Sequence, residues 1–231
     1  MYYNHFEHKS KNAIHIETIK KMTEQHTLVI ELSAVIVSVA ADGAPHIVVA
    51  EGCALPSGPL ETQHTKLEQA LRSWVARHSG LTLGYVEQLY TFADRDRETN
   101  GKRIISIGYL ALARDLVPTG NDKLQTIDWY RFFPWEDHRT GAPVKLIAQI
   151  RKTLTLWKNQ ADSPTEKRQR TARIAVAFPK DPRDWNEELV LQRYELLWQA
   201  GLLKESRNEP PSPQTQPLPG LAMAHDHRRI L

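Results

Sequence analysis

Stretches of apolar residues separated by polar turns divide the first 141 residues into strands and one helix. A run rich in Leu, Val and Ile at 26–40 is typical of a largely buried strand. The turn sequence ADGAP at 41–45 and the apolar residues at 46–50 predict the returning strand of a hairpin. Two later apolar runs predict strands that flank a polar hairpin loop: strands at 83–92 and 104–113, loop at 93–103.

A helix is predicted between the hairpin and the later strands. The sequence LPSGPL at 55–60 precedes it, and we expect no regular structure there because glycine and proline disfavour it. Over 66–78 the apolar residues recur at the spacing of one helix face, and Gly80 predicts the end of the helix. Strands interrupted by a helix predict an α/β (α+β) fold, a mixed sheet sandwiched by helices.

The pattern changes after residue 141, where helical spacing at 145–157 and 185–200 predicts a helical appendage. Between these helices we expect the basic run Lys167-Arg168-Gln169-Arg170 to be an exposed polar loop. The sequence NEPPSPQTQPLPG holds five prolines and predicts an extended linker. The expected organisation is an N-terminal extension (1–25), a sheet domain (26–141), the helical appendage (142–207), the linker (208–220) and a final segment (221–231).

Composition narrows the class of protein only slightly. The 231 residues include one cysteine, Cys53, which excludes an internal disulfide and argues against a zinc cluster. No apolar stretch is long enough to span a membrane and the start lacks signal-peptide features, so we expect a cytoplasmic protein without a membrane partner. Residues 142–231 carry 15 Lys/Arg against 10 Asp/Glu, a bias of +5 that permits contact with a polyanion, although a solvated face is the simpler interpretation.

The segment at 55–81 (LPSGPLETQHTKLEQALRSWVARHSGL) resembles the Nudix box, in which a glycine is followed by a glutamate, an Arg-Glu pair, a Glu-Glu pair and a closing glycine. Gly58, Arg72 and Gly80 match that pattern. The positions of the acidic residues carry other side chains: His64, Ser73, and either Ala76-Arg77 or Arg77-His78.

In the Nudix family the acidic residues bind magnesium, which polarises a diphosphate while water attacks it. The resemblance therefore implies a Nudix-like fold that is catalytically inactive and holds no metal. Glu61 and Glu68 are the carboxylates that remain nearby. An active Nudix pyrophosphohydrolase that uses them to bind magnesium, and acts on ADP-ribose or a related nucleoside diphosphate derivative, is the alternative.

Two further stretches narrow the resemblance. GYVEQLYTFADRDR at 84–97 and SIGYLAL at 106–112 resemble Nudix-related transcriptional regulators of NAD biosynthesis (NadQ/NrtR-like), and LPSGP at 55–59 and QRYELL at 192–197 are similar to the NadQ group. The resemblance covers roughly 26–231. It implies a homodimer that binds an ADP-ribose- or NAD-type nucleotide as effector. Full-length relatives bind DNA through a C-terminal winged helix. Here HDHRRIL at 225–231 resembles only the start of the helix leading to it, so we expect that domain to be absent.

A nucleotide diphosphate needs cationic groups for its phosphates. Arg95 and Arg97, in the loop after the strand ending at 92, are the first candidates, and Lys102 and Arg103 return on the other side of that loop. A polar loop in which Asp94 or Asp96 pairs with Arg95 is an equally good interpretation. Arg72 is a further candidate, or else an i, i+4 partner of Glu68.

The base of a nucleotide needs an aromatic face. Tyr90, Phe92 and Tyr109 are the candidates for stacking, although aromatic residues on strands are more often part of the core. His64 is a candidate for a phosphate contact, or an ordinary loop histidine. A remnant or scaffold that binds no small molecule is the third hypothesis, after the effector domain and the hydrolase.

Overall fold

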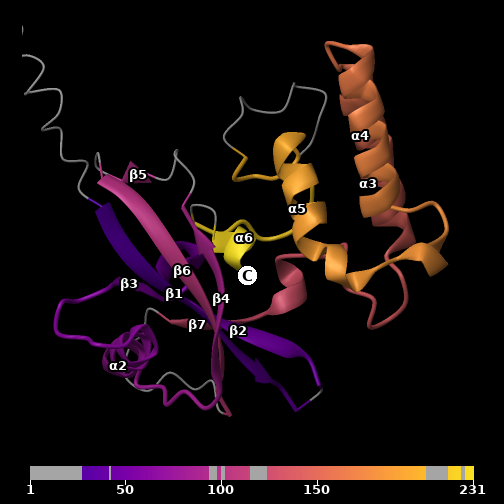
Figure 1. Cartoon of the computed structure of the whole chain (residues 1–231). Coiled ribbons are helices and arrows are strands. Elements are labelled where there is room, and N and C mark those ends of the chain that lie inside the picture. The colour runs from indigo at the N-terminus through magenta and orange to yellow at the C-terminus, as the bar shows by residue number, and fades with distance from the viewer. Residues whose placement is uncertain are drawn as a thin grey trace, which may run out of the picture.

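The computed structural model describes residues 28–41, 43–93, 98–99, 102–114, 124–206, 218–224 and 227–231. Arg95, Arg97, the N-terminal extension and most of the predicted linker lie outside these residues. The described strands form one seven-stranded sheet (Figure 1): β1 (Leu28–Val39), β2 (Pro45–Val49), β3 (Ser57–Pro59), β4 (Val86–Phe92), β5 (Glu98–Thr99), β6 (Lys102–Leu112) and β7 (Gln125–Asp128).

The sheet is mixed, as predicted. Its main path runs β4-β6-β1-β2-β7, and β3 and β5 pair with β1 and β6 outside this path. β1 and β6 run parallel over ten paired residues, from Leu28↔Arg103 to Val37↔Leu112, whereas the other pairs are antiparallel. The long parallel pair places the two most apolar segments at the centre, where strands are buried on both faces.

The expectation of no regular structure at 55–60 is wrong, because β3 lies there and pairs with β1. Proline is tolerated in a strand at an edge, and Pro59 pairs with Glu31 at the end of such a short strand. The polar loop at 93–103 likewise contains β5, a two-residue strand beside β6. β7 was not predicted, because its four residues alternate too briefly to give a pattern.

Helix α2 (Leu67–Ser79) covers one face of the sheet and agrees with the predicted helix within one residue at each end. Ala70, Leu71 and Val75 on its buried side pack with even-numbered residues of β1 such as Ala34 and Ile36. Gly80 caps the helix in the left-handed conformation (φ 68°), and its N–H donates to the carbonyl of Ala76. A glycine is favoured here because it adopts positive φ without a Cβ clash.

The opposite face of the sheet packs against helices from the second half of the chain (Figure 1). These are α3 (Val144–Asn159), α4 (Pro164–Ala177) and α5 (Val190–Gln199). Trp135 is fully buried at the junction, and Trp129, Trp185 and Trp198 pack around the same core. The predicted appendage therefore shares one hydrophobic core with the sheet.

The basic run at 167–170 is helical, so the expectation of a polar loop is wrong. Ser163 accepts a hydrogen bond from the N–H of Glu166, whose carboxylate accepts one from the N–H of Asp162, and Pro164 begins the helix. This capping arrangement was a readable sequence signal, but α4 buries too little apolar surface to show helical periodicity.

The helix predicted at 185–200 is shorter in the structure, because two 3₁₀ turns (Pro182–Asp184 and Glu187–Leu189) precede α5. The last element is α6 (His227–Ile230), a single turn. Within the described residues, the helices are too short or too polar to cross a membrane.

Candidate functional site

The loop before α2 passes closely over the helix at Gly58. A Cβ at this position would lie 2.1 Å from Nε1 of Trp74, well inside any allowed contact. The Trp74 ring stacks on His78, with centroids 4.4 Å apart. Gly58 is therefore required for the loop to approach the helix, because any Cβ at this position would overlap Trp74.

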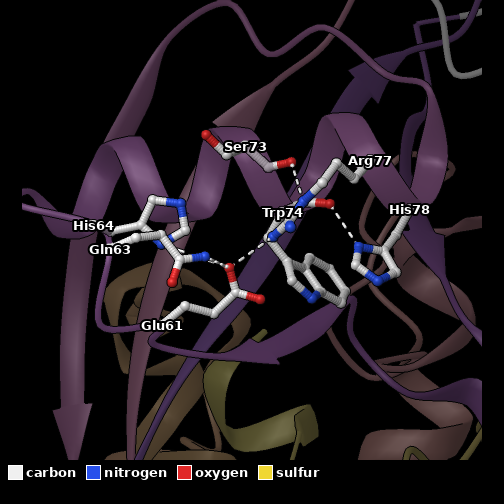
Figure 2. A network of polar contacts seen from close by, with 7 residues as sticks. All are labelled: Glu61, Gln63, His64, Ser73, Trp74, Arg77 and His78. Carbon is white, nitrogen blue, oxygen red and sulfur yellow. Dashed lines mark hydrogen bonds and ion pairs between the residues drawn. The ribbon is translucent and has the colours of Figure 1, made fainter.

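A polar network links the segment after this loop to α2 (Figure 2). Oε2 of Glu61 accepts hydrogen bonds from Nη2 of Arg77 at 3.0 Å and from Nε2 of Gln63 at 2.5 Å. Arg77 also donates to the carbonyl of Ser73. Nδ1 of His64 is buried without a hydrogen-bond partner, 3.8 Å from the same Glu61 oxygen. His64 thus faces the network, and a phosphate contact by His64 stays a prediction.

Arg72 connects α2 to the chain before β4. Its Nε donates to Glu68 at 2.9 Å, Nη1 to the carbonyl of Leu83 at 2.7 Å and Nη2 to that of Gly84 at 2.9 Å. The i, i+4 pair with Glu68 that the sequence left open is therefore present. A guanidinium has five N–H donors, so two remain, and binding of a ligand by Arg72 stays a prediction.

The donor set of the loop and helix does not suit magnesium, which prefers several carboxylate or water oxygens in octahedral geometry. Arg77 and Arg72 each occupy a carboxylate, Glu61 and Glu68 respectively. A guanidinium stays charged in proteins and repels a nearby cation. Among the residues that the structure describes, no three His, Cys, Asp or Glu side chains gather in a way that could hold a metal ion.

The three aromatic candidates lie on different faces of the sheet. Tyr109 is buried on the α2 side, where its hydroxyl donates to Gln88 at 3.2 Å. Burial raises the pKa of Tyr109, and the Glu68 carboxylate raises it further. Phe92 belongs to the core of the opposite side, and its ring lies 6.5 Å from that of Tyr90. Tyr90 is 65% exposed and is therefore the aromatic face that a ligand can reach without rearrangement.

Arg103 lies at the start of β6, and strand alternation places it on the α2 side with Tyr109. Its Nη2 donates to the carbonyl of Ala93, and its Nε is buried without a hydrogen-bond partner. The other cations predicted for this loop, Arg95 and Arg97, lie outside the described residues. The grouping of the three arginines stays a prediction.

Sequence reasoning missed the two residues that organise the loop most directly, Trp74 and Gln63. Trp74 was assigned only to the apolar face of the helix, although it also forms the surface beneath Gly58. Arg77 was identified at a position where the box has an acidic residue, but its ion pair with Glu61 was not predicted, because the two residues are sixteen apart. A spacing of sixteen residues carries no local signal.

A scan of protein-family models and a search of curated protein sequences found no match to this chain. Several solved structures are similar. The Nudix domain of Shewanella oneidensis NrtR, complexed with ADP-ribose, aligns at 18% identity and a TM-score of 0.38, over 47% of this chain and 76% of that one. S. oneidensis NrtR itself aligns at 15% and 0.38, over 73% of this chain and 77% of that one.

The Ap4A hydrolase of Caenorhabditis elegans is also similar, at 15% identity and a TM-score of 0.35, over 44% of this chain and 81% of that one. These neighbours include both an ADP-ribose complex and a hydrolase.

Proposed function

We propose that this chain is the effector-binding domain of a transcriptional regulator of NAD biosynthesis, which binds an ADP-ribose- or NAD-type nucleotide without hydrolysing it. The observation that supports this proposal is the ion pair between Arg77 and Glu61, 3.0 Å apart. An arginine stands where the resembling family has its paired glutamates, and it holds a carboxylate that remains near the box.

The same pairing argues against hydrolysis. Metal-assisted attack on a diphosphate requires a cation beside the phosphoryl oxygens. In this chain Arg77 and Arg72 take up the carboxylates that would bind that cation. The loop, its glycine and its helix are otherwise intact, which fits a frame retained for binding.

The nucleotide contacts follow from charge and exposure. Arg103, with Arg95 and Arg97, supplies guanidinium groups, which bind phosphate bidentately. Tyr90 offers an exposed ring on which a base can stack. A homodimer, and DNA contact through a winged helix in full-length relatives, complete the proposal.

Isothermal titration calorimetry with ADP-ribose and NAD, in EDTA and in magnesium, tests the proposal. We expect binding in EDTA and no loss of nucleotide by chromatography in either buffer. A ligand at 100 times its Kd should raise the free energy of unfolding by about 2.7 kcal/mol. Arg103→Gln should weaken binding, whereas Arg183→Gln, which changes an 89% exposed side chain paired with Asp181, should not.

Two results would overturn the proposal. Magnesium-dependent loss of ADP-ribose that is abolished by Glu61→Gln or Glu68→Gln would identify an active pyrophosphohydrolase. Absence of binding by either nucleotide would favour a scaffold that takes no small ligand.

A further inference from the structure

The C-terminal segment, residues 218–224 and 227–231, lies between the sheet and α5 on the face opposite α2 (Figure 1). It is tied into the interior by side chains that are nearly fully buried: Leu218, Met223, His227, Arg228 and Ile230. Two of these five are basic, and basic side chains are rarely buried without partners.

Arg228 anchors the segment. Its guanidinium donates to Glu205 at 2.6 Å, and to the carbonyls of Phe132 and Leu221 at 2.8 Å and 3.0 Å. Both side chains of the ion pair are at most 7% exposed. Loss of one member of such a pair is costly, so the contact defines one docked position of the segment.

Ile230 and Arg229 extend this docking to the sheet and to α5. A Cβ at Gly108 of β6 would lie 2.8 Å from Cγ2 of Ile230, so the glycine makes room for the isoleucine. Arg229 pairs with Glu195 of α5 and lies over the ring of Phe92. The short helix α6 therefore contacts both the sheet, through Ile230, and α5, through Arg229.

His227 connects the segment to the glycine loop. Its Nδ1 accepts a hydrogen bond from the backbone N–H of Leu55 at 2.9 Å, and both groups are buried. Leu55 lies three residues before Gly58, and its carbonyl accepts a hydrogen bond from Ser57 in β3. Without His227 this N–H would be buried and unsatisfied, a state that native proteins avoid.

We infer that the C-terminal segment is a positioning element of the candidate site: docking of His227 and the conformation of the glycine loop are coupled. A nucleotide that binds the loop in its present form stabilises the docked segment. Conversely, any force that withdraws the segment lowers the affinity of the loop for its ligand, because such coupling is reciprocal. The ligand part of this inference depends on the proposed function, but the coupling itself does not.

Amide hydrogen exchange in the full chain tests the coupling without a ligand. His227→Gln carries its amide further from the backbone, near the place of Nε2, whereas His227→Asn places an amide oxygen near the place of Nδ1. We expect faster exchange at Leu55 and Gly58 in the glutamine variant and near wild-type exchange in the asparagine variant. Arg183→Gln, which changes an 89% exposed side chain outside the C-terminal segment, leaves both the docking contacts and the hydrogen bond to Leu55 intact and serves as the control.

Calorimetry with ADP-ribose then tests the effect on the site. His227→Gln should weaken binding by about fivefold or more, the usual range of coupling between sites, and His227→Asn should restore most of the affinity. Wild-type protection of Leu55 in His227→Gln would overturn the inference, as would unchanged affinity. If the wild type binds no ADP-ribose, the proposed function fails, while the exchange at Leu55 still decides whether the segment positions the loop.

Discussion

Replacing Gly58 by alanine should destabilise the protein through Trp74. The new Cβ would lie 2.1 Å from Nε1, whereas ordinary contacts begin at 3.4 Å, so the indole has to retreat by 3.4 − 2.1 = 1.3 Å. Retreat disturbs the stacking on His78 and the position of α2 over the sheet. Overpacking in proteins costs about 1–3 kcal/mol, and the size of this overlap places the expected loss of stability at the upper end, about 3 kcal/mol.

Urea unfolding followed by circular dichroism measures this loss as a shift of the midpoint at constant slope. The matched control is the same substitution in a Trp74→Ala background, where the space is free and the further loss should be below about 0.5 kcal/mol, as for substitutions without a structural conflict. Equal losses in both backgrounds would show that Trp74 is not the cause. A stability of Gly58→Ala close to wild type would refute the reasoning entirely.

Three further substitutions test the structure. Arg193→Met leaves the buried Glu136 carboxylate unpaired and should cost about 3–5 kcal/mol by urea unfolding. Burial already raises the pKa of Glu136 against the lowering effect of Arg193. Removal of the Arg193 guanidinium raises the pKa of Glu136 further, so Glu136 in the folded variant binds a proton more tightly than in the unfolded chain. Its stability should increase as pH falls from 8 to 5, and a loss independent of pH would contradict this. Arg72→Met removes the hydrogen bonds to the carbonyls of Leu83 and Gly84 and should lower stability by about 1–3 kcal/mol in thermal unfolding. An unchanged Tm would show that these two hydrogen bonds do not stabilise the fold. Ser163→Ala removes the cap of α4 and should cost about 1 kcal/mol, whereas Ser163→Asp should retain stability.

The polar network around Glu61 holds the segment after the glycine loop against α2. A carboxylate without a metal or a hydrogen-bond donor beside it would not help to fix the conformation of the loop. In this chain Arg77 and Gln63 bind it, and Arg72 binds Glu68 while it holds the chain before β4. Surface ion pairs contribute little stability each, so the value of this network lies in the conformation of the loop rather than in a large free energy.

Local pattern determined much of this protein. The apolar runs predicted β1, β4 and β6 because buried strands need continuous hydrophobicity, and the helical spacing predicted α2 and α3 nearly to the residue. Gly58, Arg72 and Gly80 match the pattern of the Nudix box, and this resemblance indicated the loop and its helix. The absence of glutamates at the matched positions was equally visible.

Only the tertiary structure decided which residues meet. Successive residues of a strand point to opposite faces, and Phe92 pairs with Ser106 of β6, an odd number of residues from Tyr109. Tyr109 therefore lies with α2 while Phe92 lies in the other core, although both were candidates to stack on the same base. Arg77 binds Glu61, which is sixteen residues away in the sequence, and His227 accepts a hydrogen bond from Leu55, which is 172 residues away. Hydrogen bonds of this kind depend on packing that brings distant backbone together, and no local pattern of hydrophobic and polar residues encodes them.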